Sequence, residues 1–346
     1  MRHSQLSQIR SVRRFGASFG AVALLLAGVM PTQADPIADF YQGRTINMLI
    51  GVGAGGEYDL QARLVARHIG KHIPGHPTVV PQNMTGAGGL KMINYLHGIA
   101  PKDGTNIGMI QNAFPALQAA GLPGVQFDAG MMQWLGTIAP VVETMAVWHT
   151  AGVKSIDDAR GRETVAGASG RGAITFTYPA MMNELLGTKF KIVTGYPGGN
   201  AINLAMERNE VEARNNTWSS WKATKADWLK EKKITVIAQA GPRAPDLDAP
   251  SVEDAARTPQ ERQLIELVVS GTQLGRPFAT NEAPADRVAA LRSAFASTMK
   301  DPEFLSEAQA LGFDVDPVLG EKMQAIVQKV LATPKDVAAR AKSLLE

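Results

Sequence analysis

The feature that most constrains the fold is a repeated unit of apolar strand, glycine-rich loop and amphipathic helix. Thr45 to Ile50 is an apolar run that ends in the glycines of 51–56, and helix-spaced apolar residues follow from Tyr58 to Ile73. The unit then recurs before a third strand, with a strand at 78–81, glycines at 86–89, a helix at 90–100 and the third strand at 106–110. Strands that alternate with helices in this way predict parallel pairing and a sheet covered on both faces.

A second copy of the unit begins near Thr164, which predicts a second α/β lobe. Strands are expected at 164–168, 190–194, 211–215 and 234–239, glycine loops at 168–172 and 198–199, and a helix at 172–186. Three further helices, at 284–299, 301–311 and 319–331, carry no glycine loop and are expected to cap the first lobe.

Two apolar segments are expected to be extended and to carry the chain between the lobes, at Trp134–Val147 and Leu267–Phe278. The chain would then cross twice, near residues 140 and 270. We therefore predict lobe 1 at 35–141 and 271–346, and lobe 2 at 142–270. A cleft between two hinged lobes is a common place for a small ligand.

The first 34 residues have the pattern of a secretory signal peptide. Four arginines and no acidic residue precede an apolar run from Phe15 to Val29, and Thr32-Gln33-Ala34 offers a cleavage site. The run, about fifteen residues long, is short for a membrane span. Without the four arginines the formal charge of +3 becomes −1, which argues against nucleic-acid or anionic-membrane partners. We expect export to a Gram-negative periplasm, by either the general or the twin-arginine route.

The chain contains no cysteine. This excludes a disulfide scaffold, thiol catalysis, a zinc–thiolate site and a lipid-modified cysteine at the cleavage point.

The loop Gly51–Gly56 formally matches the GxGxxG pattern of dinucleotide-binding proteins. That pattern also needs an acidic residue at the end of the second strand, and this strand ends in Gln82-Asn83, so no nucleotide cofactor is expected. A glycine loop that opens a helix still presents unpaired N–H groups and favours an anion. The loop Asn83–Gly89 repeats the arrangement on the next strand. Two such loops could hold one carboxylate, or the glycines could only permit tight turns.

These loops also carry a resemblance to a family. The motifs are Gly55-Gly56-Glu57-Tyr58-Asp59-Leu60-Gln61-Ala62-Arg63, Asn83 to Gly89, Ala100-Pro101-Lys102-Asp103-Gly104, Gly167 to Gly172, Tyr196-Pro197-Gly198-Gly199 and Glu210-Val211-Glu212. In this order, over essentially the whole mature chain, they resemble the Bug or TctC-like receptors of tripartite tricarboxylate transporters.

The resemblance implies a periplasmic-binding-protein fold of the second type, with two Rossmann-like lobes, mixed sheets and a two-crossing hinge. It also implies a ligand carboxylate gripped by both first-lobe loops. Carried over by residue, it assigns Gly55, Gly56, Glu57, Tyr58, Asp59, Asn83, Gly86, Ala87 and Gly88 of lobe 1, and Ser169, Gly170, Arg171, Gly172, Gly198, Asn200 and Trp218 of lobe 2, to the ligand site.

Some of these positions depart from the family pattern. Glu57 and Tyr58 stand where glycine and threonine are frequent, and Ala168, Ala173 and Glu212 also differ. Arg171 could bind a second acidic group, pair with Glu57 across the cleft, or remain solvated. Tyr58, Tyr196 and Trp218 could stack on an aromatic ligand or only pack.

Two other site types find little support. His68 and His72 lie four residues apart on one helix, but no third metal ligand follows at a telling spacing, so no metal is expected. Ser169 lies in a sequence that fits the nucleophile-elbow pattern only if Arg171 were glycine, and His97 and His149 have no recognisable catalytic context.

The expected protein is therefore a monomeric solute receptor and not an enzyme. Its closed, ligand-bound form would be recognised by a membrane permease. A sensor protein that docks on a membrane kinase would need the same fold and remains the alternative.

Overall fold

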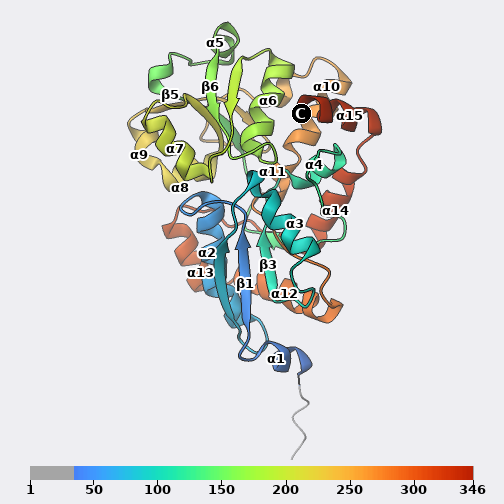
Figure 1. The fold of residues 1–346 in the computed structure, drawn as a ribbon. Helices are drawn as coiled ribbons and strands as arrows, with labels where there is room; N and C mark the ends of the chain where they lie inside the picture. Colours follow the sequence, from blue (N-terminus) through green and yellow to red (C-terminus); the bar gives the residue numbers. More distant parts are fainter. Residues whose placement is uncertain (1–34, 346) are drawn as a thin grey trace, which may run out of the picture. The chain divides into compact units, whose positions relative to one another are not determined.

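The computed structural model describes residues 35–345, and the predicted signal peptide lies outside the described residues. The described strands form two sheets, each with helices packed against it (Figure 1). Both sheets contain parallel and antiparallel pairs, so the predicted mixed α/β fold class is confirmed.

The first sheet has the strand order β11-β4-β10-β3-β1-β2. Its strands are β1 (Thr45–Ile50), β2 (Thr78–Asn83), β3 (Asn106–Met109), β4 (Gln133–Thr137), β10 (Phe278–Thr280) and β11 (Val318–Leu319). β1 pairs in parallel with β2 and β3, as the repeated strand–helix units require. β10 and β11 come from late in the chain and add antiparallel pairs with β3 and β4.

The second sheet has the order β7-β6-β8-β5-β9. Its strands are β5 (Glu143–Trp148), β6 (Thr164–Gly167), β7 (Phe190–Val193), β8 (Ala213–Thr217) and β9 (Ile234–Ala240). β6 is parallel to β7 and β8, whereas β5 lies antiparallel between β8 and β9.

Helices connect and cover these strands. They are α1 (Pro36–Tyr41), α2 (Glu57–Ile69), α3 (Leu90–Gly98), α4 (Phe114–Ala119), α5 (Ile156–Gly161), α6 (Ile174–Leu186), α7 (Gly199–Glu207), α8 (Trp218–Thr224), α9 (Ala226–Lys230), α10 (Pro259–Val269), α11 (Gly271–Leu274), α12 (Ala285–Thr298), α13 (Pro302–Ala310), α14 (Gly320–Leu331) and α15 (Lys335–Leu345). Short 3₁₀ helices lie at Gly70–His72, Ala87–Gly89, His149–Ala151 and Val252–Ala255.

The chain passes from the first sheet to the second between β4 and β5, and returns between β9 and β10. The return includes α10 and α11, so the prediction that 267–278 is extended was wrong for most of that segment. The reason lies upstream, where Thr258 caps α10 by accepting from the Glu261 N–H and Pro259 occupies the first turn. The apolar residues that follow have helical spacing and are buried.

The C-terminal helices do not all cover the first sheet. α12 packs against β4 and α2, α13 against α2, and α14 against β4. α15 instead packs against α6 and α10, and its Val337 and Ala341 belong to the same buried cluster as Met181 and Leu264. Although 271–346 is predicted to belong with the first lobe, α15 thus packs on helices that adjoin the second sheet.

Between residues 35 and 345, no helix combines the length and the apolar character needed to cross a membrane.

Candidate functional site

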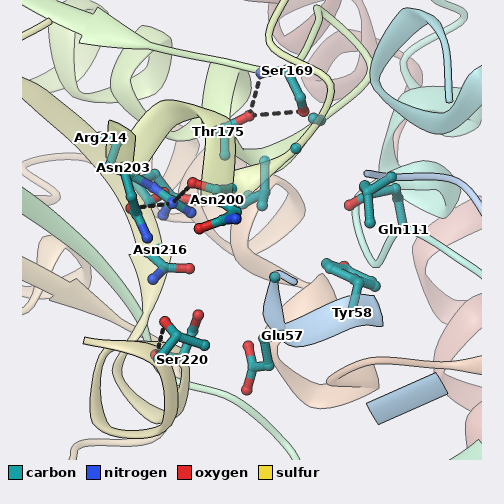
Figure 2. A pocket seen from close by; sticks show the side chains of 18 of the residues that line it. Glu57, Tyr58, Gln111, Ser169, Thr175, Asn200, Asn203, Arg214, Asn216 and Ser220 are labelled. Carbon is teal, nitrogen blue, oxygen red and sulfur yellow. Dashed lines mark hydrogen bonds between the residues drawn. The ribbon is translucent and has the colours of Figure 1, made fainter. Parts of the chain in front are cut away.

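One pocket is lined by loops that follow strands of both sheets (Figure 2). Seven of the sequence-predicted site residues line it, namely Gly55, Gly56, Glu57, Tyr58, Ser169, Gly198 and Asn200. The other nine lie outside its lining, namely Asp59, Asn83, Gly86, Ala87, Gly88, Gly170, Arg171, Gly172 and Trp218.

Three helices begin at this pocket. The residues that precede the first helical turns of α2, α6 and α7 are Gly56, Ala173 and Gly198, and all three line the pocket. None of the three has a side chain that can accept a hydrogen bond from its helix's first turn, and no such bond is formed. The first turn of each helix is therefore uncapped by a side chain, and the positive ends of three helix dipoles meet at one pocket, which favours an anion.

Asp59 stabilises the glycine loop before α2 by accepting hydrogen bonds on the side away from the pocket lining. The Asp59 carboxylate accepts from the Gly55 N–H at 3.0 Å and from Asn83 Nδ2 at 2.9 Å, and it pairs with Arg63 Nε at 3.0 Å. Burial opposes ionisation of Asp59, but the bonds from Arg63, Gly55 and Asn83 prevail and lower its pKa. Asp59 and Asn83 thus shape the loop and do not line the pocket.

The second glycine loop packs against the segment that follows β6 of the second sheet. A Cβ added at Gly170 would lie only 2.6 Å from the Gly88 nitrogen, and one added at Gly88 would lie 3.0 Å from the Ala173 nitrogen. The Gly53 N–H also donates to the Pro197 carbonyl at 2.7 Å. Backbone from the two sides of the pocket is therefore in direct contact.

We expect Gly170→Ala to weaken the binding of any molecule held in this pocket by about tenfold or more, because the new methyl group collides with backbone that cannot move aside while the two sides of the pocket stay in contact. Gly170 has no left-handed φ, so the open protein should fold normally. Gly161→Ala is the matched control, since nothing lies within 4 Å of its added Cβ. Calorimetric titration and small-angle scattering would measure affinity and closure; equal affinity for both variants would contradict this role.

Polar side chains from the second sheet's side form one wall of the pocket. Arg214 of β8 is only 4% exposed, and its Nη1 donates to the Gly199 carbonyl at 2.6 Å and to Asn203 Oδ1 at 2.7 Å. Its Nε donates to the Asn215 carbonyl at 3.1 Å. Burial, assisted by the positive charge of Arg276, lowers the pKa of Arg214 to about 9, which leaves it cationic at neutral pH. Figure 2 shows Asn200, Asn216 and Ser220 around it.

A buried charge cluster joins the two sides of the pocket, with Glu57 on α2 and Glu143 on β5 of the second sheet. Arg276 donates to Glu57 Oε2 from Nε at 3.0 Å and from Nη2 at 2.7 Å. Its guanidinium also stacks over Tyr58, with Cζ 4.1 Å from the ring centroid. Ser219 donates to the other oxygen of Glu57 at 2.6 Å. Glu143 is 0% exposed and accepts from Asn215 Nδ2 at 3.0 Å. Burial raises the pKa of Glu143.

Glu57 therefore pairs with Arg276. The alternative interpretation of the sequence, in which Glu57 pairs with Arg171, was wrong. The Arg171 guanidinium lies outside the pocket and stacks over the Phe176 ring at 5.0 Å. Trp218 donates from Nε1 to Asp246 at 2.8 Å and does not reach the pocket lining. Tyr58 lies under Arg276, so its ring is engaged by the protein itself.

Sequence reasoning missed much of the pocket, including Gln111, Glu143, Thr175, Asn203, Arg214, Asn215, Asn216, Ser220 and Arg276. One local signal was available. Ala213-Arg214-Asn215-Asn216-Thr217 is a strand whose residues are all buried although four are polar, and buried polar runs need partners. Arg276 has no comparable signal, because its role depends on residues far away in sequence.

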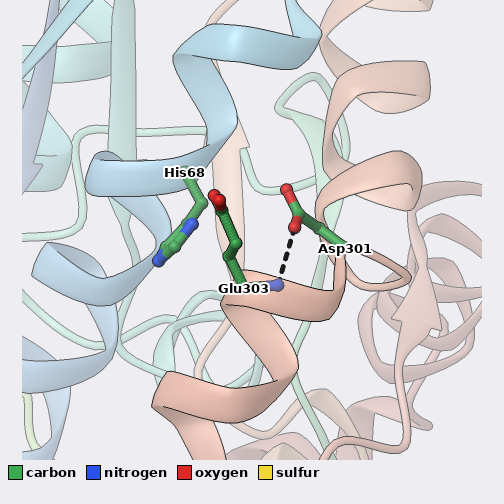
Figure 3. Close-up of side chains that lie close together, drawn as sticks. All are labelled: His68, Asp301 and Glu303. Atoms are coloured by element: carbon green, nitrogen blue, oxygen red, sulfur yellow. Dashed lines mark hydrogen bonds between the residues drawn. The ribbon is translucent and has the colours of Figure 1, made fainter.

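The histidine pair of α2 and the following turn meets acidic residues of α13 that the sequence spacing did not reveal. His68, Asp301 and Glu303 have ligand-type atoms within 4.8 Å of one another (Figure 3). His72 Nε2 also lies 2.8 Å from Asp301, a partner 229 positions away that no local spacing could reveal. Lys71 Nζ, however, lies 2.6 Å from Asp301 and 2.5 Å from Glu303. This ammonium provides the positive charge that a metal ion would supply.

We expect Asp301→Asn to lower the free energy of unfolding at pH 7 by about 1.5 kcal/mol, because it removes a charged hydrogen-bond acceptor. The bond from Lys71, followed by those from His72 and the Glu303 N–H, lowers the pKa of Asp301. A carboxyl whose folded pKa is depressed contributes its full stabilisation above its unfolded pKa and loses it progressively as the pH falls from about 4 through the lower folded pKa. Urea unfolding at pH 7 and pH 3 should therefore show the wild type and variant converging; a constant gap would contradict this assignment.

Comparisons with known proteins agree with the architecture. No family model matches the chain. A Cupriavidus necator protein described as "UPF0065 protein in gbd 5'region" is 36% identical over 99 residues, which is 29% of this chain and 28% of that protein. The match thus spans less than a third of that relative's length.

Three solved structures resemble nearly the whole chain. They are the periplasmic binding protein BugD (19% identity, 88% of this chain and 98% of that chain, TM-score 0.70), an R. palustris protein with adipate (18%, 86% and 97%, 0.67) and MatC from Rhodopseudomonas palustris with bound malate (16%, 88% and 99%, 0.66). At sequence identities of 16–19%, the similarity shows a shared fold. The chain has the fold of the Bug-type periplasmic binding proteins, which confirms at that level the resemblance implied by its sequence motifs.

Proposed function

We propose that this chain is a receptor that binds a small carboxylic acid in the pocket between its two lobes. The observation that carries the proposal is the convergence of the uncapped N-termini of α2, α6 and α7 with the buried guanidinium of Arg214 on one space. Helix N-termini and a guanidinium are the groups that proteins use to hold carboxylates. The adipate and malate bound to two structural neighbours are carboxylates, which supports the same ligand class here.

The arrangement differs from the grip implied by the family resemblance. The second first-lobe loop, Gly86 to Gly88, contacts Gly170 and Ala173 rather than the pocket. In our proposal the first lobe contributes the N-terminus of α2, and the second lobe contributes the N-termini of α6 and α7 together with Arg214. Ligand binding would then bridge the lobes directly and stabilise the closed form.

A binding function is favoured over catalysis. Ser169, the nearest approach to a nucleophile, lies 3.3 Å from Thr175 Oγ1, and no histidine is among the described residues that line the pocket. The structural neighbours named as binding proteins point the same way.

The test is a thermal-shift screen of residues 35–346 against small carboxylic acids and their amides, with calorimetry on each hit. A bound acid at a hundred times its dissociation constant should stabilise the fold by about 2.7 kcal/mol. The corresponding amide, which lacks the charge, should give no shift. Binding of nucleotides or metal ions with no response to any acid would contradict the proposal.

We propose further that the mature chain acts as a monomer in the periplasm and delivers its ligand to a permease of the tripartite tricarboxylate type. The signal peptide pattern at 1–34 and the fold of the neighbours support this. N-terminal sequencing of exported protein should begin at Asp35. Deleting the gene should abolish cellular uptake of the acid. Normal uptake with a lost transcriptional response to the acid would favour docking on a sensor kinase instead.

A further inference from the structure

Arg276 brings an unused hydrogen-bond donor to the pocket. Its side chain is buried and lines the pocket, and its Nε and Nη2 are engaged by Glu57. Among residues 35–345, Nη1 of Arg276 has no hydrogen-bond partner, and Glu143 Oε1 lies 3.8 Å away, beyond hydrogen-bond distance. Buried donors are normally satisfied, so an acceptor supplied by the ligand fits this position.

The identity of this donor is unambiguous. A guanidinium nitrogen can only donate, whereas the oxygen and nitrogen of an amide are assigned from their surroundings. Asn216 Nδ2 is also buried without a partner at the same pocket, but it could equally present its oxygen. The inference therefore rests on Arg276.

The charges around Arg276 limit what the acceptor can be. Glu57 pairs with it directly, and Glu143 approaches its free nitrogen at 3.8 Å. Two carboxylates thus already surround this one guanidinium, and both are almost fully buried, with side chains 2% and 1% exposed. An ionised group of the ligand placed at Nη1 would be a third anion at a site with little solvent to screen the repulsion.

The two arginines of the pocket therefore differ in their direct partners, which are carboxylates for Arg276 and neutral groups for Arg214. Arg214 on the second-sheet side forms its hydrogen bonds with neutral partners, the carbonyls of Gly199 and Asn215 and the amide oxygen of Asn203. Among residues 35–345, no carboxylate is hydrogen-bonded to Arg214, and Glu143 and Glu57 act on it only at longer range. The charge of Arg276 is compensated by the protein, and only its hydrogen-bonding capacity is left.

We propose that Arg276 Nη1 donates to a neutral oxygen of the ligand, so that the receptor selects monocarboxylic acids with a hydroxyl, keto or amide oxygen at their far end and discriminates against dicarboxylic acids. This rests on the proposed function, because it takes the carboxylate to lie at Arg214 and the helix N-termini. Arg276 is in this view a specificity-determining residue.

The test compares three acids of equal chain length by calorimetry, from four to six carbons. The set is the ω-hydroxy acid, the unsubstituted monocarboxylic acid and the dicarboxylic acid, for example 4-hydroxybutanoate, butanoate and succinate. At the best chain length we expect the hydroxy acid to bind at least tenfold more tightly than either of the others. A dicarboxylic acid that binds most tightly at every length would overturn the inference and leave the proposed function intact.

Two variants separate charge from hydrogen bonding. Glu143→Gln keeps the shape of the side chain but removes one negative charge beside Nη1, so we expect the dicarboxylic acid to gain at least fivefold relative to the hydroxy acid. Arg276→Lys preserves a cation for Glu57 but not the Nη1 donor, so the preference for the hydroxy acid over the unsubstituted acid should fall to less than threefold. Arg171→Met, outside the pocket, should change neither ratio.

Unchanged ratios in both pocket variants, with melting temperatures showing that they fold, would overturn the role of Arg276. A failure of every acid to bind the wild-type protein would contradict the proposed function itself. The experiment therefore distinguishes a failure of the role of Arg276 from a failure of carboxylic-acid binding itself.

Discussion

Arg214→Met is expected to weaken the binding of every carboxylic acid by about ten- to a hundredfold. A hydrogen bond to a charged group contributes about 1.5–3 kcal/mol, and this variant removes the guanidinium that faces the ligand while methionine retains much of the side-chain volume. The bonds of Arg214 to Gly199 and Asn203 also hold the first turn of α7, so the N–H groups of that turn would lose some of their order. Calorimetry with the acid found in the initial screen measures the effect.

The matched control is Arg171→Met, because the sequence assigns Arg171 to the ligand and the structure places it outside the pocket. Its affinity should stay within a factor of two of the wild type. If Arg171→Met weakened binding more than Arg214→Met did, the ligand would have to lie at the glycine loop 170–172 and the pocket assignment would be wrong. Circular dichroism melting of both variants would show that each retains its fold.

The fold could be predicted because its determinants are local. Each glycine loop lies between an apolar strand and an amphipathic helix, and that order alone requires parallel neighbours such as β1 and β2. The first jaw of the site follows from the same local pattern, which is why Gly55 and Gly56 were correctly placed at a helix N-terminus. The position of the C-terminal helix was less predictable, since α15 packs on α6 and α10, which are distant from it in sequence.

The buried charge cluster around Arg276 could not be predicted, because the residues that form it are distant from one another in sequence. Glu57 meets Arg276 across 219 positions, and Ser219 reaches Glu57 across 162. The spacing of glycines indicates which loops could bind an anion. It does not indicate which of these loops instead pack against another part of the chain. Gly86 to Gly88 have the right local chemistry for an anion and nevertheless pack against Gly170 and Ala173.

The buried pair of Arg276 and Glu57 leads to the largest expected effect on stability. Arg276→Met should lower the free energy of unfolding by about 3–5 kcal/mol, because it leaves Glu57 and Glu143 buried without their cation. The control is Arg243→Met, whose partner Asp254 is equally exposed, with side chains 63% and 64% accessible, and whose loss should lower it by less than about 1 kcal/mol. Urea unfolding of residues 35–346 provides both values.

The double variant Glu57→Gln/Arg276→Met tests whether the loss comes from the stranded charge or from the missing packing over Tyr58. If the charge is the cause, adding Glu57→Gln removes one of the two uncompensated carboxylates, and the double variant should be more stable than Arg276→Met alone by about 1–3 kcal/mol. If packing is the cause, Glu57→Gln should add its own destabilisation instead, because Glu57 also accepts from Ser219 and Thr217 of the opposite lobe. The sign of that difference decides between a charge cluster that Arg276 neutralises and a stack that it merely completes.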